Sequence, residues 1–266
     1  MLGKGRWRVR WFGLMTTLLS LLLSACGHPS VVDLKLTAVL PHDASAFTQG
    51  LFFHRGKLYE STGLYGESRV RGDINLQNGQ AATETVLSED VFGEGSVILN
   101  GTLYVLTWQE GEILKFDPDT LELREVQPYS RDGWGLTTDG KQLIASDGTS
   151  SLFFLTEDLE TVRCLTVTRE GRPVTRLNEL EYIDGCIWAN VWMSDEILRI
   201  NPKTGKVIQT IFAREILPAS AFDTGDSDAV LNGIAWNEET KKLYLTGKCW
   251  PNLYEFDIQR TGFGER

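Results

Sequence analysis

The sequence has 266 residues, a formal net charge of −10 and 42% hydrophobic residues. This acidic balance argues against nucleic acid as a partner, because nucleic-acid surfaces attract clustered Lys and Arg. The chain is long enough to bury a sizeable core in one all-β domain.

Residues 1–25 have the features of a bacterial lipoprotein signal peptide. Four basic residues precede an apolar run, Trp11–Leu23, that is too short to span a membrane as a helix. The run ends in Leu-Ser-Ala-Cys, which resembles a lipobox, so we predict lipidation at Cys26 and a short tether over 26–30. Gly27 follows instead of Asp, which in lipoprotein sorting favours the outer membrane. A plain secretory signal or an uncleaved anchor is the alternative.

Loss of this leader would leave 22 basic and 36 acidic residues, a formal charge of −14. An anionic membrane surface repels such a chain, so attachment would depend on the lipid alone. We predict a monomer held by its N-terminal lipid on the periplasmic side of the cell envelope. Three cysteines remain, Cys164, Cys186 and Cys249. An oxidising compartment permits one bridge among them, which we expect between Cys164 and Cys186.

Five segments of similar sequence recur along the rest of the chain. They begin with TQGLFF, GEGSVI, GWGLTT, LNELEY and LNGIAW, at Thr48, Gly93, Gly133, Leu177 and Leu231. The apolar residues that close their third strands are spaced by 42, 39, 45 and 56 positions, at Ile74, Phe116, Leu155, Ile200 and Phe256. A period of about 40–50 residues with several strands per unit is typical of a β-propeller.

We therefore predict an all-β, five-bladed β-propeller over residues 31–258, followed by a C-terminal tail over 259–266. A β-sandwich is the alternative. The segment Val31–Leu40 precedes the first repeat, so we expect it to close the ring as the outer strand of the last blade. Extra sequence at Phe212–Val230 is expected to form a solvated loop, or else a lid, with one or two helical turns at its start.

Alignment of the five repeats gives two columns of distinctive residues. The position before the shared Gly or its equivalent on each first strand, which lines the central channel, holds Gln49, Glu94, Trp134, Asn178 and Asn232. The position just after each second strand holds Gly63, Trp108, Gly148, Trp192 and Lys248. Strand ends at one mouth of a propeller build the site, so these columns predict an apolar pocket with a few converging polar groups. Packing tryptophans and turn asparagines are the structural alternative.

The residue types in this predicted pocket disfavour several common reactions. A single acid in the ring disfavours glycoside hydrolysis, which uses two carboxylates. The three histidines, His28, His42 and His54, form no metal-spaced cluster, and HExxH, paired CxxC and GxSxG motifs are absent. A lone carboxyl group among indoles can still shuttle a proton. Burial among the indoles would raise the pKa of this group, whereas Lys248, if close to it, would lower the pKa.

The segments FTQGL, FGEG, LTW, GWGL, LNELEY, ANVW, LNGIAW and LTGKCWP occur in this order over nearly the whole mature chain. They resemble the plant and bacterial type of glutaminyl-peptide cyclotransferase. The resemblance implies a five-bladed propeller that converts the N-terminal glutamine of a peptide or protein to pyroglutamate with loss of ammonia, without a metal or other cofactor. It places the pocket on Phe47, Gln49, Phe92, Glu94, Trp108, Trp134, Asn178, Trp192 and Lys248. Seven of these nine stand in the two columns, and the two phenylalanines lie two residues before first-column positions, on the same strand face.

The implied mechanism uses aromatic walls to fold the substrate glutamine and exclude water. Glu94 would carry the proton, and Lys248, with Asn178 or Gln49, would stabilise the oxyanion. Two other functions stay open. One is a Ca²⁺-dependent lactonase-like propeller, in which the glutamate and asparagines would hold the ion. The other is a non-catalytic envelope propeller that binds a peptide or protein end.

Overall fold

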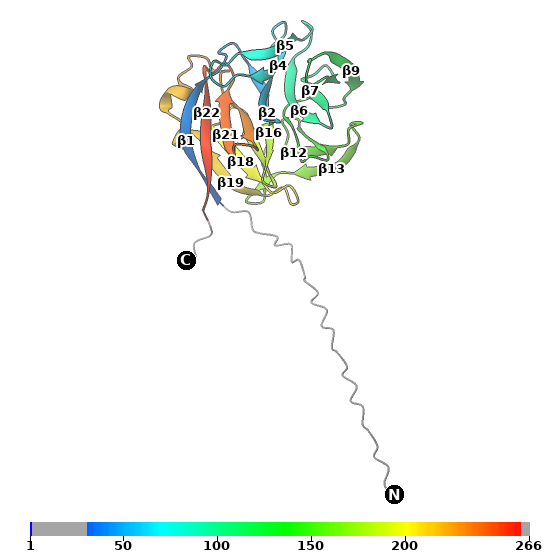
Figure 1. Ribbon diagram of the computed structural model, residues 1–266, viewed down its shortest axis with the longest axis vertical. Helices are drawn as coiled ribbons and strands as arrows, with labels where there is room; N and C mark the ends of the chain where they lie inside the picture. The colour runs from blue at the N-terminus through cyan, green and yellow to red at the C-terminus, as the bar shows by residue number, and fades with distance from the viewer. Residues whose placement is uncertain (2–30, 262–266) are drawn as a thin grey trace.

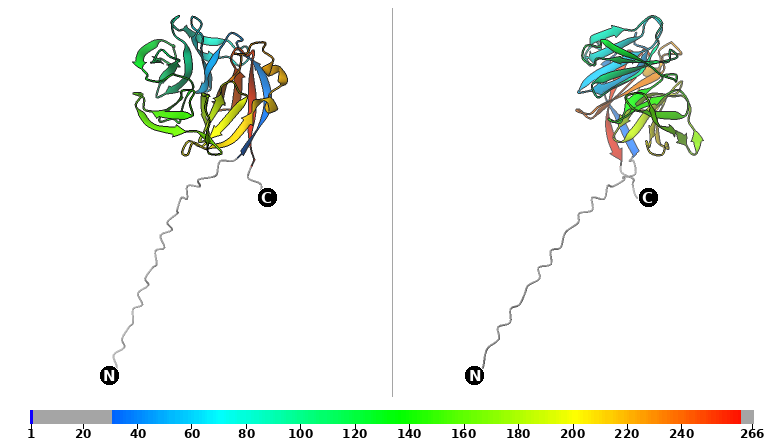
Figure 2. Two further views of the ribbon diagram at one scale, coloured as in Figure 1. Left: turned by 180° about the vertical axis from the view of Figure 1, so that it is seen from behind. Right: turned by 90° about the vertical axis from the view of Figure 1, so that its right-hand side faces the viewer.

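The computed structural model describes Met1 and residues 31–261. The predicted leader, Cys26, the tether and residues 262–266 lie outside the described residues. The described chain forms five four-stranded antiparallel sheets arranged in a ring (Figures 1 and 2). The prediction of a five-bladed β-propeller is confirmed.

Each blade consists of four strands, which follow one another from the channel outward. The first blade contains β2 (Thr48–His54), β3 (Lys57–Thr62), β4 (Arg69–Ile74) and β5 (Ala81–Val86). The second contains β6 (Gly93–Leu99), β7 (Thr102–Thr107), β8 (Glu112–Phe116) and β9 (Leu123–Pro128). The third contains β10 (Leu136–Thr138), β11 (Leu143–Ser146), β12 (Ser151–Leu155) and β13 (Thr161–Thr166). The fourth contains β16 (Leu177–Ile183), β17 (Cys186–Val191), β18 (Glu196–Ile200) and β19 (Val207–Phe212). The fifth contains β20 (Leu231–Asn237), β21 (Lys242–Gly247), β22 (Asn252–Thr261) and β1 (Val31–Pro41). A two-stranded ribbon, β14 (Thr168–Arg169) and β15 (Arg172–Pro173), lies in the chain between the third and fourth blades.

The strands change character from the channel to the rim. The inner strand β6, GEGSVIL, is buried at every position. The outer strand β5, AATETV, alternates between half-buried and exposed side chains, as expected for a strand that faces solvent on one side. The small and apolar sequences of the inner strands therefore pack around the channel, while the alternating sequences cover the outside.

The first and last strands close the ring together. β1 pairs antiparallel with β22 from Val31 opposite Thr261 to Pro41 opposite Asn252, so the N-terminal strand completes the fifth blade as predicted (Figure 1). Because this pairing extends to Thr261, the last strand passes the predicted domain boundary at residue 258 by three residues.

A buried cluster of charged side chains also links the first and fifth blades. His42 contacts the backbone oxygen of Trp250 through Nδ1 at 2.7 Å and Glu60 through Nε2 at 2.9 Å. Arg71 donates to the other oxygen of Glu60 at 2.6 Å. Burial raises the pKa of Glu60, but His42 and Arg71 outweigh it and lower the pKa to about 2. The carboxylate therefore stays ionised and, through His42, links the first blade to the fifth.

The 212–230 segment packs more closely than the solvated loop we expected. It begins with a single helical turn, α1 (Ala213–Ile216), followed by the 3₁₀ turn η1 (Ala219–Phe222). Its side chains Ala213, Leu217 and Ala221 are buried in the core that the fourth and fifth blades share. Phe222 meets Trp250 edge to face, with ring centroids 5.3 Å apart. No helix among the described residues is long and apolar enough to cross a membrane.

The expected Cys164–Cys186 disulfide is absent from the described chain, and both residues are free thiols, as is Cys249. Cys164 is exposed on β13, the outer strand of the third blade. Cys186 is buried at the start of β17 in the next blade, where Arg199 contacts its sulfur at 3.9 Å. The prediction was wrong because it used only the number of cysteines, which carries no information on the blade or strand that each occupies.

Candidate active site

A β-bulge at the start of the inner strand sets the first-column residue in four blades. The pairing of the inner strand with its neighbour shifts register at this place in β2, β6, β16 and β20. The residues within the shifts include Gln49, Glu94, Asn178 and Asn232. A bulge breaks the alternation of side chains along a strand and re-aims one of them. The repeated bulge therefore explains why polar side chains gather at one end of the channel.

The glycines that follow these positions are required by contact between neighbouring inner strands. A Cβ on Gly95 would lie 2.4 Å from the backbone nitrogen of Leu136, and a Cβ on Gly135 would lie 1.9 Å from the backbone oxygen of Asn178. Any side chain at these positions would push the second, third and fourth blades apart. The shared Gly of the repeat is thus a packing requirement of the ring.

The fourth blade has Glu179 in place of that glycine. Its carboxylate accepts hydrogen bonds from the backbone nitrogens of Leu51, at 3.4 Å, and Ile234, at 2.9 Å, so it links the first and fifth blades across the channel. Glu181 accepts a third, from Trp236 at 3.0 Å. Burial raises the pKa of Glu179 well above its ordinary value and raises that of Glu181 to about 8. These two acids were not identified from the sequence. They lie outside the pocket, and their hydrogen bonds hold the fourth blade to the first and fifth blades.

The second column lies just past the second strand of each blade. The residue after it adopts the left-handed backbone conformation at Leu64, Met193 and Cys249, with φ of 85°, 60° and 57°. Glycine in this column leaves room for an aromatic ring. A Cβ on Gly63 would lie 2.3 Å from the ring of Phe92, and a Cβ on Gly148 would lie 2.6 Å from the ring of Trp134. The column thus alternates between residues that contribute a side chain to the mouth and residues that make space for one.

The two columns meet around a cavity of about 280 Å³. Its lining consists of Phe47, Gln49, Leu64, Phe92, Glu94, Trp108, Trp134, Asn178, Trp192, Asp228 and Lys248. All nine residues that the family resemblance placed in the pocket therefore lie together. Asn232, which belongs to the first column, is fully buried and is not among the lining residues.

Aromatic rings form two walls of this cavity. On one wall, Phe92 packs against Phe47 and Trp108, with centroid distances of 6.2 and 5.5 Å. On the other wall, Trp134 and Trp192 meet edge to face at 5.6 Å. Such packing gives the cavity rigid apolar walls.

A relay of hydrogen bonds fixes the carboxyl group of Glu94. Asn232 donates to the side-chain oxygen of Gln49 at 3.2 Å, and also to the backbone oxygen of Thr48 at 2.8 Å. Because Gln49 accepts through its oxygen, its amide nitrogen is directed at Glu94, to which it donates at 3.0 Å. Asn232 thus orients Gln49, and Gln49 orients Glu94.

Glu94 and Lys248 are the charged groups buried in the cavity, with 5% and 4% of their surfaces exposed. Burial raises the pKa of Glu94 well above its ordinary value, and the nearby Lys248 offsets part of this rise. Burial likewise lowers the pKa of Lys248, with Glu94 opposing it. The Nζ atom of Lys248 lies 4.4 Å from the ring centroid of Phe47, a cation–π distance. The site therefore holds an acid and an amine that both exchange protons more readily near neutral pH than free side chains do.

A family model described as "Glutamine cyclotransferase" matches residues 14–258. The chain belongs to the glutamine cyclotransferase family. It is 40% identical over 233 residues to a glutaminyl-peptide cyclotransferase of Arabidopsis thaliana, an alignment that covers 86% of this chain and 72% of that protein. Its fold matches the crystal structure of Myxococcus xanthus glutaminyl cyclase with a TM-score of 0.81 and 34% identity, covering 88% of this chain and 100% of that one. The prediction from the sequence of this family, and of an enzyme of this type, is confirmed.

Two lining residues of this glutamine cyclotransferase were not predicted, Leu64 and Asp228. Asp228 comes from the 212–230 segment, which has no counterpart in the other repeats, so alignment of the blades could not find it. Leu64 follows a column position and reaches the cavity through its left-handed backbone.

The polar groups of the cavity also bear on what it can hold. The side-chain oxygen of Asn178 is buried and has no hydrogen-bond partner within the described residues, which leaves it available to a ligand. No group of three or more His, Cys, Asp or Glu side chains among residues 31–261 is placed to hold a metal ion.

Proposed function

We propose that the chain cyclises the N-terminal glutamine of peptides and proteins to pyroglutamate and releases ammonia, with Glu94 as the proton carrier. The observation that carries this proposal is the buried carboxyl group of Glu94, held by Gln49 within an aromatic cavity beside Lys248. The family relationship supplies the reaction, and the cavity supplies residues suited to each step.

In the first step the substrate α-amine attacks the carbon of its own γ-carboxamide. The new C–N bond closes a five-membered ring, and the amine loses a proton to Glu94. A carboxylate whose pKa is raised is a stronger base than an ordinary carboxylate, so it accepts this proton more readily. Its protonated form then serves as the acid in the next step. The aromatic walls favour the folded-back substrate and raise the effective concentration of the amine.

In the second step the tetrahedral intermediate collapses. Lys248 lies in the same cavity and stabilises the oxyanion, together with the amide nitrogen of Asn178. The free oxygen of Asn178 can accept a hydrogen bond from the substrate amide. Glu94 returns its proton to the amide nitrogen as the C–N bond breaks, and ammonia leaves. Gln49 is engaged with both Asn232 and Glu94, so its role is to orient Glu94.

The test is ammonia release from glutamine amide and from a Gln-initiated dipeptide. Glu94→Gln should lower kcat by about 10²- to 10⁴-fold, the range for loss of a general acid–base, while circular dichroism and thermal unfolding show an intact fold. Glu89→Gln, at an exposed acid outside the cavity, is the matched control and should leave the rate unchanged. A Glu94→Gln rate close to that of the wild type would remove Glu94 from the mechanism.

The same assay addresses the calcium-dependent alternative. The ammonium group of Lys248 lies in the cavity with Glu94 and Asp228, and a cation beside it would be repelled. We therefore expect full activity after dialysis against EDTA. Loss of activity that Ca²⁺ restores would favour the metal-dependent function. Correctly folded protein that releases no ammonia would favour a binding propeller without catalysis.

We also propose that Cys26 carries a lipid that holds the enzyme, as a monomer, at the periplasmic side of the cell envelope. The support is the leader sequence and its resemblance to a lipobox. Metabolic labelling with a radioactive fatty acid should mark the wild-type chain and not Cys26→Ser.

A further inference from the structure

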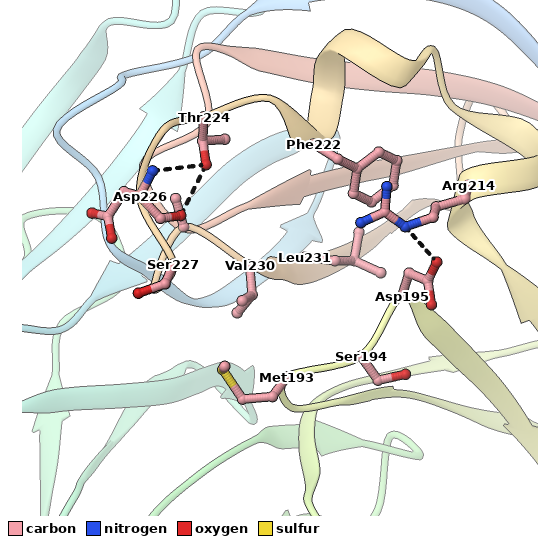
Figure 3. Close-up of a pocket in the computed structure, with 11 residues that line it drawn as sticks. Met193, Ser194, Asp195, Arg214, Phe222, Thr224, Asp226, Ser227, Val230 and Leu231 are labelled. Carbon is pink, nitrogen blue, oxygen red and sulfur yellow. Dashed lines mark hydrogen bonds and ion pairs between the residues drawn. The ribbon is translucent and has the colours of Figure 1, made fainter.

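A second cavity, of about 340 Å³, lies next to the candidate active site. It opens between the loop after β17 and the 222–231 segment, which face each other in Figure 3. Its lining includes Met193, Arg214, Phe222, Asp226, Ser227 and Val230. No step of the proposed mechanism uses these residues.

Two stretches of chain run from the walls of the active-site cavity into the walls of this second cavity. Trp192 lines the first cavity and Met193 the second. Asp228 lines the first, and Val230, two residues on, lines the second. The backbone oxygen of Val230 also accepts a hydrogen bond from the backbone nitrogen of Lys248 at 2.9 Å. The two cavities therefore lie next to each other, and the same two stretches of chain contribute to the walls of both.

We propose that the second cavity, which we name the exit groove, binds the second and third residues of the substrate peptide. This inference rests on the proposed function. The carbonyl carbon of an N-terminal glutamine is bonded to the next residue, so a peptide whose first residue is buried must leave through the mouth. The exit groove meets this mouth on two walls, where Met193 follows Trp192 and where Val230 follows Asp228 by two residues.

The lining of the exit groove suits a short extended peptide. Met193, which is 48% exposed, and Val230 offer apolar contact from opposite sides (Figure 3). Arg214 lies over the ring of Phe222 at 4.4 Å and is paired with Asp195 at 3.0 Å, so its charge is compensated. These groups provide a surface for side chains of moderate size.

The charge of the groove predicts a preference among substrates. Asp226 is exposed on the groove and has no ion-pair partner within the described residues. Asp228 adds a second negative charge where the groove meets the active site. The groove therefore favours Lys or Arg at the second or third position over Asp or Glu, by about two- to fivefold for exposed charges.

A competing route leads over the first blade, where a smaller hollow of about 240 Å³ lies beside Gly66 and Glu67. Tyr65 borders that side of the mouth. Its hydroxyl donates to Glu110 at 2.8 Å, and its ring packs on that of Phe92 with the centroids 5.4 Å apart. The active-site lining approaches this hollow through Leu64, two residues before Gly66, and through Phe47, two residues after Ser45, whereas Trp192 and Met193, which lead into the exit groove, are adjacent in the sequence. The exit groove is thus the better route on geometry.

The experiment compares kcat/KM for glutamine amide, which has no second residue, with that for Gln-Ala-Lys and Gln-Ala-Glu amides. Ser227→Trp places an indole in the groove and should lower kcat/KM about tenfold on both tripeptides, with less than about twofold change on glutamine amide. Asp226→Asn should narrow the preference of the wild type for the lysine peptide. Asp158→Asn, an exposed acid in the turn between β12 and β13, is the matched control and should behave as the wild type.

The outcomes separate the groove from the reaction. If the wild type releases no ammonia from glutamine amide, the proposed function itself is overturned. If glutamine amide is converted and Ser227→Trp changes the tripeptides no more than it changes glutamine amide, the groove is overturned. A loss specific to tripeptides in Tyr65→Ala but not in Ser227→Trp would also overturn it and would assign the exit to the first blade.

Discussion

Replacement of Glu181 by Gln should remove a pH-dependent loss of stability. Glu181 is buried on the inner strand of the fourth blade, outside the active-site cavity. One of its oxygens accepts from the backbone nitrogen of Trp236 at 3.0 Å, and the other accepts from the hydroxyl of Thr137 at 3.3 Å. Gln can keep both contacts, with its oxygen on Trp236 and its amide nitrogen donating to Thr137, as a protonated Glu181 does.

The size of the effect follows from the pKa of Glu181. Burial raises it from the ordinary value of 4.5 to about 8. Between these values the folded protein holds a proton that the unfolded chain has lost, so the free energy of unfolding falls as the pH rises. One proton corresponds to about 1.4 kcal/mol per pH unit, or about 5 kcal/mol over the whole interval. Gln has no proton to lose, so the variant should match the wild type near pH 4.5 and exceed it by up to about 5 kcal/mol above pH 8.

Urea unfolding of the wild type and Glu181→Gln at four or more pH values across this interval measures the difference directly. Glu89→Gln, at an exposed acid, controls for the loss of one negative charge. Ammonia release should be unchanged, because Glu181 does not line the cavity. If the two stability curves run parallel with pH, Glu181 titrates alike in folded and unfolded chains, and the reasoning from its burial is refuted.

Three further predictions concern the site and the anchor. Gly148→Ala should lower stability by about 1–3 kcal/mol and raise KM, because the added methyl would overlap the ring of Trp134; thermal unfolding and steady-state kinetics check this. Asn232→Leu should lower kcat about tenfold, because Gln49 loses the bond that directs its amide at Glu94; an unchanged kcat with lowered stability would make Asn232 purely structural. Cys26→Ser should move the enzyme from the membrane fraction to the soluble fraction, as measured by ammonia release in each.

The sequence predicted the ring and most of the pocket because both are repeated. Each blade must bury the same inner strand and turn at the same mouth, so the same positions recur at a period of about 40 to 56 residues. Gln49, Glu94 and Asn178 stand at equivalent bulges, and alignment of the repeats found them together. The assignment of Phe47 and Phe92 came from the family resemblance, since neither stands in a column.

Residues without an equivalent in the other blades could not be found by alignment of the repeats. Asp228 reaches the cavity from a segment without a counterpart in the other blades. Glu179 replaces the shared glycine, and its bonds to the first and fifth blades depend on distances across the channel that no local pattern encodes. The predicted Cys164–Cys186 disulfide was wrong for the same reason. The two thiols lie in different blades, and the repeat does not relate their positions to each other.

The position of Glu94 depends on three blades at once, and this ties the chemistry to closure of the ring. Its backbone oxygen accepts from Ser61 of the first blade at 2.6 Å, and its carboxyl group accepts from Gln49 of the same blade. The next residue, Gly95, donates to the backbone oxygen of Trp134 in the third blade at 2.7 Å. A hairpin taken alone could present a glutamate at this place, but it would leave the carboxyl group in water with an ordinary pKa. Only the assembled ring removes that water, so the raised pKa on which the proposed proton transfer depends is a property of the whole propeller.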